Sequence, residues 1–257
     1  MESNHYFDPP KGLTSMPIRS LMITTLGAAA LLAGCAASQQ SITIDRLEGP
    51  TTLVKNGYVI DGTGATAQIG HLLIDGDRIA DIAYGDLPTD WARATTVIDA
   101  DGKAITPGFI DIHTHGAGGA DFMDGTVDAF LQGAQTHVCY GTTTMVPTTL
   151  TSTMDELYRT LDLFREAKNA SIHRPCLHGL HLEGPYFSME QRGAQDPRYI
   201  KHPDPSEYVR VLDYSDDIVR WTLAPELPGA LEMARVLKER GIIASIGHSD
   251  AIYEEVL

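Results

Sequence analysis

The sequence predicts an α/β protein whose main part is a parallel barrel of alternating strands and helices, and three observations lead to this prediction. After residue 107, short apolar runs alternate with amphipathic stretches of helical period. Before residue 107, short runs follow one another with glycine and aspartate between them. The chain has 257 residues, of which 43% are hydrophobic and 21% charged, so it can bury a sizeable core. Alternating strands and helices favour a parallel sheet with right-handed crossovers.

Residues 1–40 are expected to lie outside the fold. Arg19 precedes an apolar run over residues 21–33, and Leu-Ala-Gly-Cys follows, ending at Cys35. This pattern resembles a bacterial lipoprotein signal, because the apolar run is shorter than a bilayer span and small residues precede the cysteine. We therefore expect a lipid anchor at Cys35, a tether behind it, and a membrane-anchored protein facing the periplasm or the exterior. The alternative is a chance N-terminal extension of a cytoplasmic protein.

Residues 41–106 are predicted to form a β-rich unit. Glycine and aspartate divide it into runs rich in apolar residues, as expected for short strands. The predicted strands cover residues 52–56, 57–61, 71–82 and 96–100.

Residues 107–257 carry the alternation of strands and helices. The predicted strands cover residues 108–115, 142–149, 176–185, 218–225 and 242–248, and the predicted helices cover residues 127–138, 154–168 and 231–240. These are five of the eight strands of a closed barrel. A further helix starts at residue 252 and the sequence stops at residue 257, so we expect an incomplete barrel. Cys139 and Cys176 are expected to be core residues, since no CxxC pair suggests a zinc finger.

The first candidate site lies at the end of the first barrel strand. A strand has a period of two residues, so Asp111, His113 and His115 point to the same side. The carboxyl ends of barrel strands are where catalytic groups gather, and imidazole is a common zinc ligand. We therefore predict that His113 and His115 bind a metal ion, or that they act as hydrogen-bond donors behind one.

Two later strands bring further ligand types to the same rim. His181 and Glu183 share one face of their strand, which delivers a carboxylate into the barrel mouth. A buried, unpaired carboxylate costs on the order of several kcal/mol, so Glu183 needs a cation opposite it, either a metal ion or an arginine such as Arg192. His248 ends the strand over residues 242–248 and emerges at the same rim. The meeting of three strands favours a metal centre.

Four motifs together resemble the N-acetylglucosamine-6-phosphate deacetylase family of the amidohydrolase superfamily. They are Pro-Gly-Phe-Ile-Asp-Ile-His-Thr-His at residues 107–115, His-Leu-Glu-Gly-Pro at 181–185, Leu-Ala-Pro-Glu at 223–226 and Gly-His-Ser at 247–249. The likeness runs from residue 51 to residue 257, and the second and fourth motifs are its most specific part.

The resemblance implies a (β/α)8 TIM barrel of the metal-dependent hydrolase type, truncated here after about five strands, beside the N-terminal half of a small β-sandwich over residues 41–106. It implies that Glu183 and His248 are metal ligands, and that one or two divalent ions, expected to be zinc, serve the reaction. The implied reaction is hydrolysis of the acetamide of N-acetylglucosamine 6-phosphate to glucosamine 6-phosphate and acetate. The substrate is therefore expected to be a small N-acetyl amino sugar, carried as its phosphate, and the full-length protein a homodimer.

One departure from the family pattern concerns substrate binding. The family commonly has Gly-Ala-His shortly after the glutamate motif, whereas this chain has Gly-Ala-Gln at residues 193–195. Ala194 and Gln195 are therefore the expected substrate contacts, with an amide in place of an imidazole. By the same resemblance the general-base aspartate is expected beyond Leu257, so no catalytic residue is assigned within these residues.

Net charge and the fourth barrel strand bear on the alternatives. The net charge of -15 and the lack of a basic run argue against a nucleic-acid partner. A dihydroorotase-like or D-aminoacylase-like hydrolase is expected to carry a bridging lysine on the fourth strand, and residues 221–226 contain none. A third alternative is an inactive metal-binding fragment, which would bind metal without hydrolysing an amide.

Overall fold

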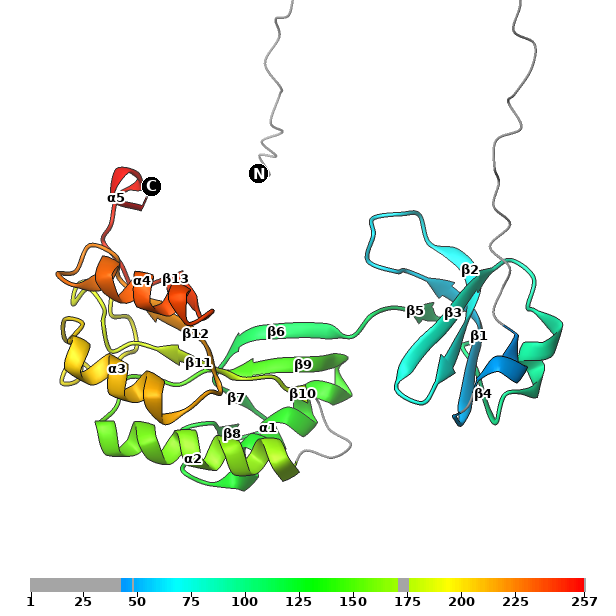
Figure 1. The fold of residues 1–257 in the computed structure, drawn as a ribbon, viewed down its shortest axis with the longest axis horizontal. Coiled ribbons are helices and arrows are strands. Elements are labelled where there is room, and N and C mark those ends of the chain that lie inside the picture. The colour runs from blue at the N-terminus through cyan, green and yellow to red at the C-terminus, as the bar shows by residue number, and fades with distance from the viewer. Residues whose placement is uncertain (1–42, 48, 171–175, 257) are drawn as a thin grey trace, which may run out of the picture.

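The computed structural model describes residues 43–47, 49–170 and 176–256. The predicted lipoprotein signal, its Cys35 and the tether lie outside these residues. Among the described residues, no helix is both long and apolar enough to cross a lipid bilayer. Figure 1 shows an N-terminal sheet followed by a set of strands that alternate with helices.

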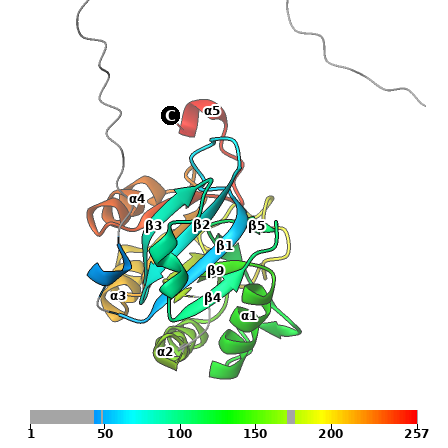
Figure 2. The same cartoon turned by 90° about the vertical axis from the view of Figure 1, so that its right-hand side faces the viewer.

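The N-terminal sheet has five strands in the order β3-β2-β1-β4, with β5 paired to β1 (Figure 2). β1 runs antiparallel to β2 and parallel to β4 and β5. A small core around Leu53, Leu73 and Trp91 packs two 3-10 helices, η1 and η2, against the sheet. The elements are η1 (Ile44–Arg46), β1 (Thr51–Val59), β2 (Gln68–Asp75), β3 (Arg78–Tyr84), η2 (Thr89–Arg93), β4 (Thr96–Asp99) and β5 (Ala104–Ile105).

Two predicted strand boundaries in this sheet are wrong. Residues 52–56 and 57–61 belong largely to one strand, β1, in which the register shifts around Asn56, whose φ is 59°. The run over residues 71–82 is two strands, because Gly76 adopts a φ of 57° and the chain turns back between β2 and β3. Apolar periodicity cannot distinguish a bulged strand from two strands, nor does it detect a tight turn inside an apolar run.

The second part contains the parallel strands that the sequence predicts. All neighbouring strand pairs from β6 to β13 in this part are parallel, apart from the short hairpin of β7 and β8. A bridge between Thr148 and His181 continues the sheet from the end of β9 to β11. The α/β class is therefore confirmed, and the strands form part of a barrel. They are β6 (Phe109–Thr114), β7 (Gly116–Ala117), β8 (Ala120–Asp121), β9 (Thr142–Pro147), β10 (Cys176–Leu177), β11 (Leu180–Glu183), β12 (Ile218–Leu223) and β13 (Ile243–Ile246).

The predicted strand over residues 176–185 is divided into β10 and β11. Gly179 lies between them, and its backbone is so close to β12 that an added Cβ atom would lie 2.4 Å from Cγ1 of Val219. The chain changes its partner at this point, since β10 pairs with β9 whereas β11 pairs with β12. The division brings the end of β11 to the rim beside β6 and β9.

Helices α1 to α4 lie in an arc around one side of the parallel strands (Figure 2). They pack with the strands in one core that includes Phe130, Phe164, Trp221 and Met233. Helix α3 is not among the predicted helices, although Asp204 caps it and a proline occupies its first turn. The helices are α1 (Val127–Cys139), α2 (Met154–Ala170), α3 (Pro205–Tyr214), α4 (Ala230–Glu239) and the short α5 (Tyr253–Val256).

Cys139 and Cys176 are both exposed, so the prediction that they are core residues is wrong. Cys139 is the last residue of α1, and Cys176 begins the two-residue strand β10. Fewer neighbours cover a side chain at the end of an element than in its middle. The place of a cysteine along its element, which composition does not show, therefore decides its burial.

Candidate metal centre

Two histidines reach the centre from the end of β6. His113 lies on β6 and His115 follows its last residue, so strand alternation sends both side chains to the same side. Nε2 of His113 lies 3.2 Å from Oε1 of Glu183, and Nε2 of His115 lies 3.2 Å from Oε2 of the same carboxylate. Each histidine thus faces a different oxygen of one glutamate.

Glu183 is the last residue of β11 and is 5% exposed. Its backbone N–H donates to Oγ1 of Thr149 at 3.3 Å. The ligand atoms of His113, His115 and Glu183 all lie within 4.8 Å of one another. The structure therefore gathers three of the four residues predicted to bind metal into one compact group, and their role as ligands stays a prediction.

The hydrogen bonds behind the histidines fit a metal ion. Nδ1 of His115 lies 3.2 Å from the carbonyl oxygen of Thr148. Since a carbonyl oxygen can only accept, Nδ1 carries a proton, and Nε2 faces Glu183, to which it donates when it is protonated as well. A metal ion that replaced the proton on Nε2 would meet the lone pair of that nitrogen. Two imidazole nitrogens with a carboxylate oxygen are also a donor set that zinc prefers.

His248, the fourth predicted ligand, lies beside the compact group. It follows β13 with a φ of 52°, and its Nδ1 lies 2.8 Å from the carbonyl oxygen of Gln191. Its Nε2 lies 3.3 Å from Oε1 of Glu183. The carbonyl of Gln191 therefore sets the tautomer of His248 as Thr148 does for His115.

Glu183 is ionised in spite of its burial. Burial by itself raises its pKa, but the hydrogen bond from His115 and the charges of the three histidines around it outweigh this effect and lower the pKa to about 2. The pKa of His115 is raised, chiefly by its hydrogen bond to Glu183 and in part by the charge of Asp121. A proton on His115 thus helps to balance the carboxylate, and a divalent cation would replace it.

His181 lies behind the centre and has no predicted role. It is fully buried, with Nε2 2.6 Å from Oγ1 of Thr222 and Nδ1 3.2 Å from Oγ1 of Thr148. Burial, together with the charge of Arg220, lowers its pKa to about 3, so the ring is neutral. The ring contacts that of His113 edge to face at a centroid distance of 4.8 Å. His181 lies two residues before Glu183 on β11, so strand alternation puts the two side chains on the same face. This spacing is the sequence signal that could have placed His181 beside the centre.

The predicted substrate contacts lie on the loop after β11. Ala194 is exposed, whereas Gln195 is 4% exposed and donates from Nε2 to Oε2 of Glu183 at 3.0 Å. Arg192 donates instead to the carbonyl oxygen of Met189, so the groups that face Glu183 are histidines and an amide. A direct contact with substrate stays a prediction for Ala194 and Gln195.

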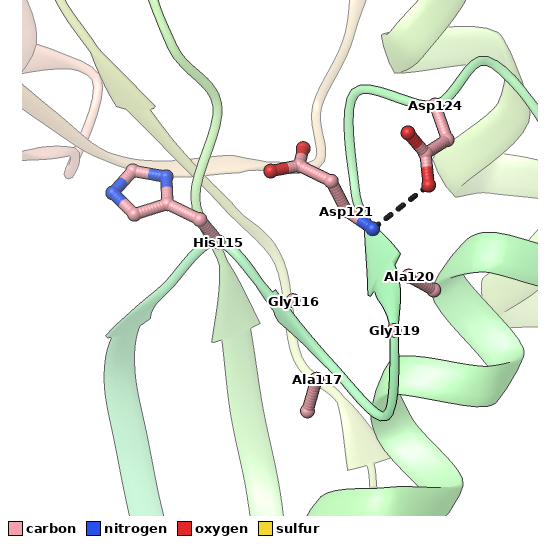
Figure 3. A pocket seen from close by; sticks show the side chains of 7 residues that line it. All are labelled: His115, Gly116, Ala117, Gly119, Ala120, Asp121 and Asp124. Carbon is pink, nitrogen blue, oxygen red and sulfur yellow. Dashed lines mark hydrogen bonds between the residues drawn. The ribbon is translucent and has the colours of Figure 1, made fainter. Parts of the chain in front are cut away.

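A cavity of about 420 Å³ opens beside His115 (Figure 3). The hairpin of β7 and β8 forms much of its wall, together with Asp121 and Asp124. The backbone N–H of Asp121 donates to Oδ2 of Asp124 at 2.9 Å, and the carboxylate of Asp121 points toward His115. A ligand in this cavity would therefore lie next to the compact group.

Parallel barrel strands that gather imidazole and carboxylate groups at their carboxyl ends define the class of metal-dependent barrel hydrolases. Comparison with known proteins agrees with this class, because the sequence model described as Amidohydrolase family matches residues 104–257. The chain belongs to the amidohydrolase family, whose members depend on metal ions.

Several of the proteins that are similar to this chain share one enzyme name. Over 205 residues the chain is 32% identical to an N-acetylglucosamine-6-phosphate deacetylase from Lysinibacillus sphaericus, a match that covers 79% of this chain and 52% of the relative. A mutant N-acetyl-D-glucosamine-6-phosphate deacetylase from Mycobacterium smegmatis, solved in complex with N-acetyl-D-glucosamine-6-phosphate, is 32% identical, with a TM-score of 0.69 over 80% of this chain and 52% of that chain. The corresponding enzyme from Pasteurella multocida gives 31% identity and a TM-score of 0.70 with the same coverage. The chain thus spans about half the length of these relatives.

Proposed function

We propose that the chain carries the metal-binding part of an N-acetylglucosamine-6-phosphate deacetylase, which hydrolyses the acetamide of N-acetylglucosamine 6-phosphate to glucosamine 6-phosphate and acetate. The observation that carries the proposal is the compact group of His113, His115 and Glu183, whose ligand atoms lie within 4.8 Å of one another. The relatives named above support the choice of reaction, because each is a deacetylase of this sugar phosphate.

In this proposal, the residues of the chain bind the metal ions and orient the side chains that hold them. The compact group, with His248 beside it, would hold one or two divalent ions, proposed to be zinc, which lower the pKa of water and polarise the amide carbonyl when bound. Glu183 supplies a negative charge that compensates the cation. The carbonyl oxygens of Thr148 and Gln191 keep two histidine rings with Nε2 toward the ion.

The more specific part of the proposal concerns the substrate, namely which N-acetyl sugar it is and that it carries a phosphate. The M. smegmatis relative was solved in complex with N-acetyl-D-glucosamine-6-phosphate. A relative from Escherichia coli O157:H7, 29% identical over 161 residues, is an N-acetylgalactosamine-6-phosphate deacetylase. The gluco epimer is proposed because the relatives with this name are the more similar ones, at 32% and 35% identity.

The test measures amine release by the purified, zinc-loaded protein, produced with the residues after Leu257 in which the general-base aspartate is expected. The substrates compared are N-acetylglucosamine 6-phosphate, its galacto epimer and unphosphorylated N-acetylglucosamine. We expect the first to be hydrolysed fastest, and we expect Glu183→Gln to abolish turnover. Glu232→Gln, which changes a carboxylate that is 65% exposed on α4, is the matched control and should keep full activity. Equal rates on the phosphorylated and unphosphorylated sugars would contradict the sugar-phosphate substrate. Bound zinc without any hydrolysis would favour an inactive metal-binding fragment.

A further inference from the structure

Gln195 is buried between two loops at the rim of the parallel strands. It lies on the loop that follows β11 and is 4% exposed. Its Oε1 accepts a hydrogen bond at 2.8 Å from the backbone N–H of Thr151, on the loop that follows β9. Its Nε2 donates to Oε2 of Glu183 at 3.0 Å. Both ends of the amide are therefore engaged by the protein itself.

The partners of this amide determine its orientation. The backbone N–H of Thr151 can only donate, and the ionised carboxylate of Glu183 can only accept. Turning the amide over would place a donor against a donor and an acceptor against an acceptor. A second bond between the loops, from the backbone N–H of Asp196 to Oγ1 of Thr151 at 3.2 Å, holds the backbone beside Gln195 in place.

The contact with Glu183 falls on an oxygen that faces the metal centre. The oxygen that accepts from Gln195 is Oε2, which also lies 3.2 Å from Nε2 of His115. The other oxygen, Oε1, lies 3.2 Å from Nε2 of His113. The terminal torsion of a glutamate is broad unless its oxygens are bonded. Nε2 of His248 also lies 3.3 Å from Oε1. A histidine that bound a metal ion through Nε2 would have no proton there to donate, whereas the amide of Gln195 keeps its N–H and fixes the plane of the carboxylate.

We propose that Gln195 is a positioning residue, which holds the carboxylate of Glu183 in the plane where it binds the metal ion. The inference rests on the proposed metal centre and differs from a direct contact with substrate. Loss of the amide frees the carboxylate to rotate and leaves the N–H of Thr151 buried without an acceptor. Replacing residues that orient a metal ligand in this way lowers metal affinity by about 10- to 100-fold.

The experiment compares the zinc affinity of the full chain with that of Gln195→Met and Gln135→Met, by chelator competition without substrate. Methionine has the length of glutamine but no donor, and the exposed Gln135 of α1 receives the same change. We expect the zinc affinity of Gln195→Met to fall by about 10- to 100-fold and that of Gln135→Met to stay unchanged. The absorption spectrum of the cobalt-substituted chain reports ligand geometry, and it should change in Gln195→Met alone.

A second variant covers the case in which Gln195→Met does not fold. Gln195→Asn keeps an amide that is one methylene too short to reach both Thr151 and Glu183, and it should show the same loss of zinc affinity. A folded variant with unchanged zinc affinity and cobalt spectrum but a raised KM would overturn the inference and make Gln195 a substrate contact. An unmodified chain that binds no zinc would overturn the metal centre, and the inference with it, so the two failures are distinguishable.

Discussion

Glu183 is the residue on which the charges of the centre converge. It is 5% exposed, and burial alone favours the neutral form of a carboxyl group. The histidines around it reverse this preference and lower its pKa to about 2. In the metal-free chain its stabilising contribution is therefore complete above its ordinary pKa of 4.5 and is lost as the pH falls toward 2. The folded chain thus presents a charged ligand over the whole neutral range.

Replacing Glu183 by glutamine keeps the shape of the side chain but removes its charge. We expect the zinc content of Glu183→Gln to fall further than that of Gln195→Ala, because the first change removes a ligand and the second leaves all ligands present. Metal analysis of the purified variants measures this, with Glu232→Gln as the control for loss of an exposed carboxylate. Equal zinc in the unmodified chain and in Glu183→Gln would rule out the ligand role.

Zinc affinity should weaken as the pH is lowered, and His115 should determine where this begins. The hydrogen bond to Glu183 raises the pKa of His115 above its ordinary value of 6.5, so a proton competes with the metal for Nε2 already above that pH. Glu183 itself stays ionised there, because its pKa is about 2. Chelator competition between about pH 6 and about pH 8 measures the effect. A zinc affinity that does not vary over this range would contradict the assignment of His115 as a ligand.

At the scale of elements, the turn after β11 determines where Glu183 points. Gly184 adopts a φ of 87°, and an added Cβ atom would lie 2.6 Å from Cγ2 of Thr151. Its carbonyl oxygen accepts a hydrogen bond at 2.8 Å from the indole nitrogen of Trp221, a buried residue of β12. The loop after β9 and the strand β12 therefore hold the turn from both sides.

Gly184→Ala should lower the free energy of unfolding more than Gly241→Ala. Gly241 has a similar φ of 73°, but nothing lies within 4 Å of an added Cβ atom there. Both variants carry the cost of a left-handed alanine, about 1 kcal/mol, and only Gly184→Ala adds a steric clash. Urea unfolding measures the difference, and zinc affinity should fall in Gly184→Ala alone. Equal loss of stability in the two variants would show that the loop around Thr151 adapts without cost.

At the scale of the whole molecule, the place of the protein in the cell and the identity of its substrate constrain each other. The proposed metal ligands lie on β6 or directly after it, at the end of β11 and after β13, so the proposed centre depends on the fold of the whole second part. The proposed substrate is a sugar phosphate, which is normally an intracellular metabolite. A lipid anchor at Cys35 would place the centre at a membrane surface and favour an unphosphorylated N-acetyl sugar or another amide instead.

Cys35→Ser should move the protein from the membrane fraction to the soluble fraction of its bacterial host. The reason is that acyl chains on Cys35 would bury many methylenes in the bilayer, at about 0.8 kcal/mol each. Fractionation followed by immunoblotting measures the shift. Mass spectrometry can contradict this prediction. Detection of an intact N-terminal peptide with an unmodified Cys35 would rule out the lipid anchor and favour a cytoplasmic protein.

Much of the centre follows from the sequence. Backbone geometry alternates side chains along a strand, so His113 with His115, and His181 with Glu183, had to share a face. Parallel barrel strands bring their carboxyl ends to one rim, so the meeting of β6 and β11 could also be predicted. The alternation of strands and helices, for the same reason, was sufficient for the fold class.

Only the tertiary structure decided how the loops meet. It turned Gln195 inward onto Glu183, because the loop after β11 packs on the loop after β9. It also divided the strand at Gly179 and left Cys139 and Cys176 exposed. Sequence by itself determined which residues share an element and a face, since these depend on local backbone geometry. Contacts between loops depend on the packing of elements far apart in the chain, and no local pattern carries that information.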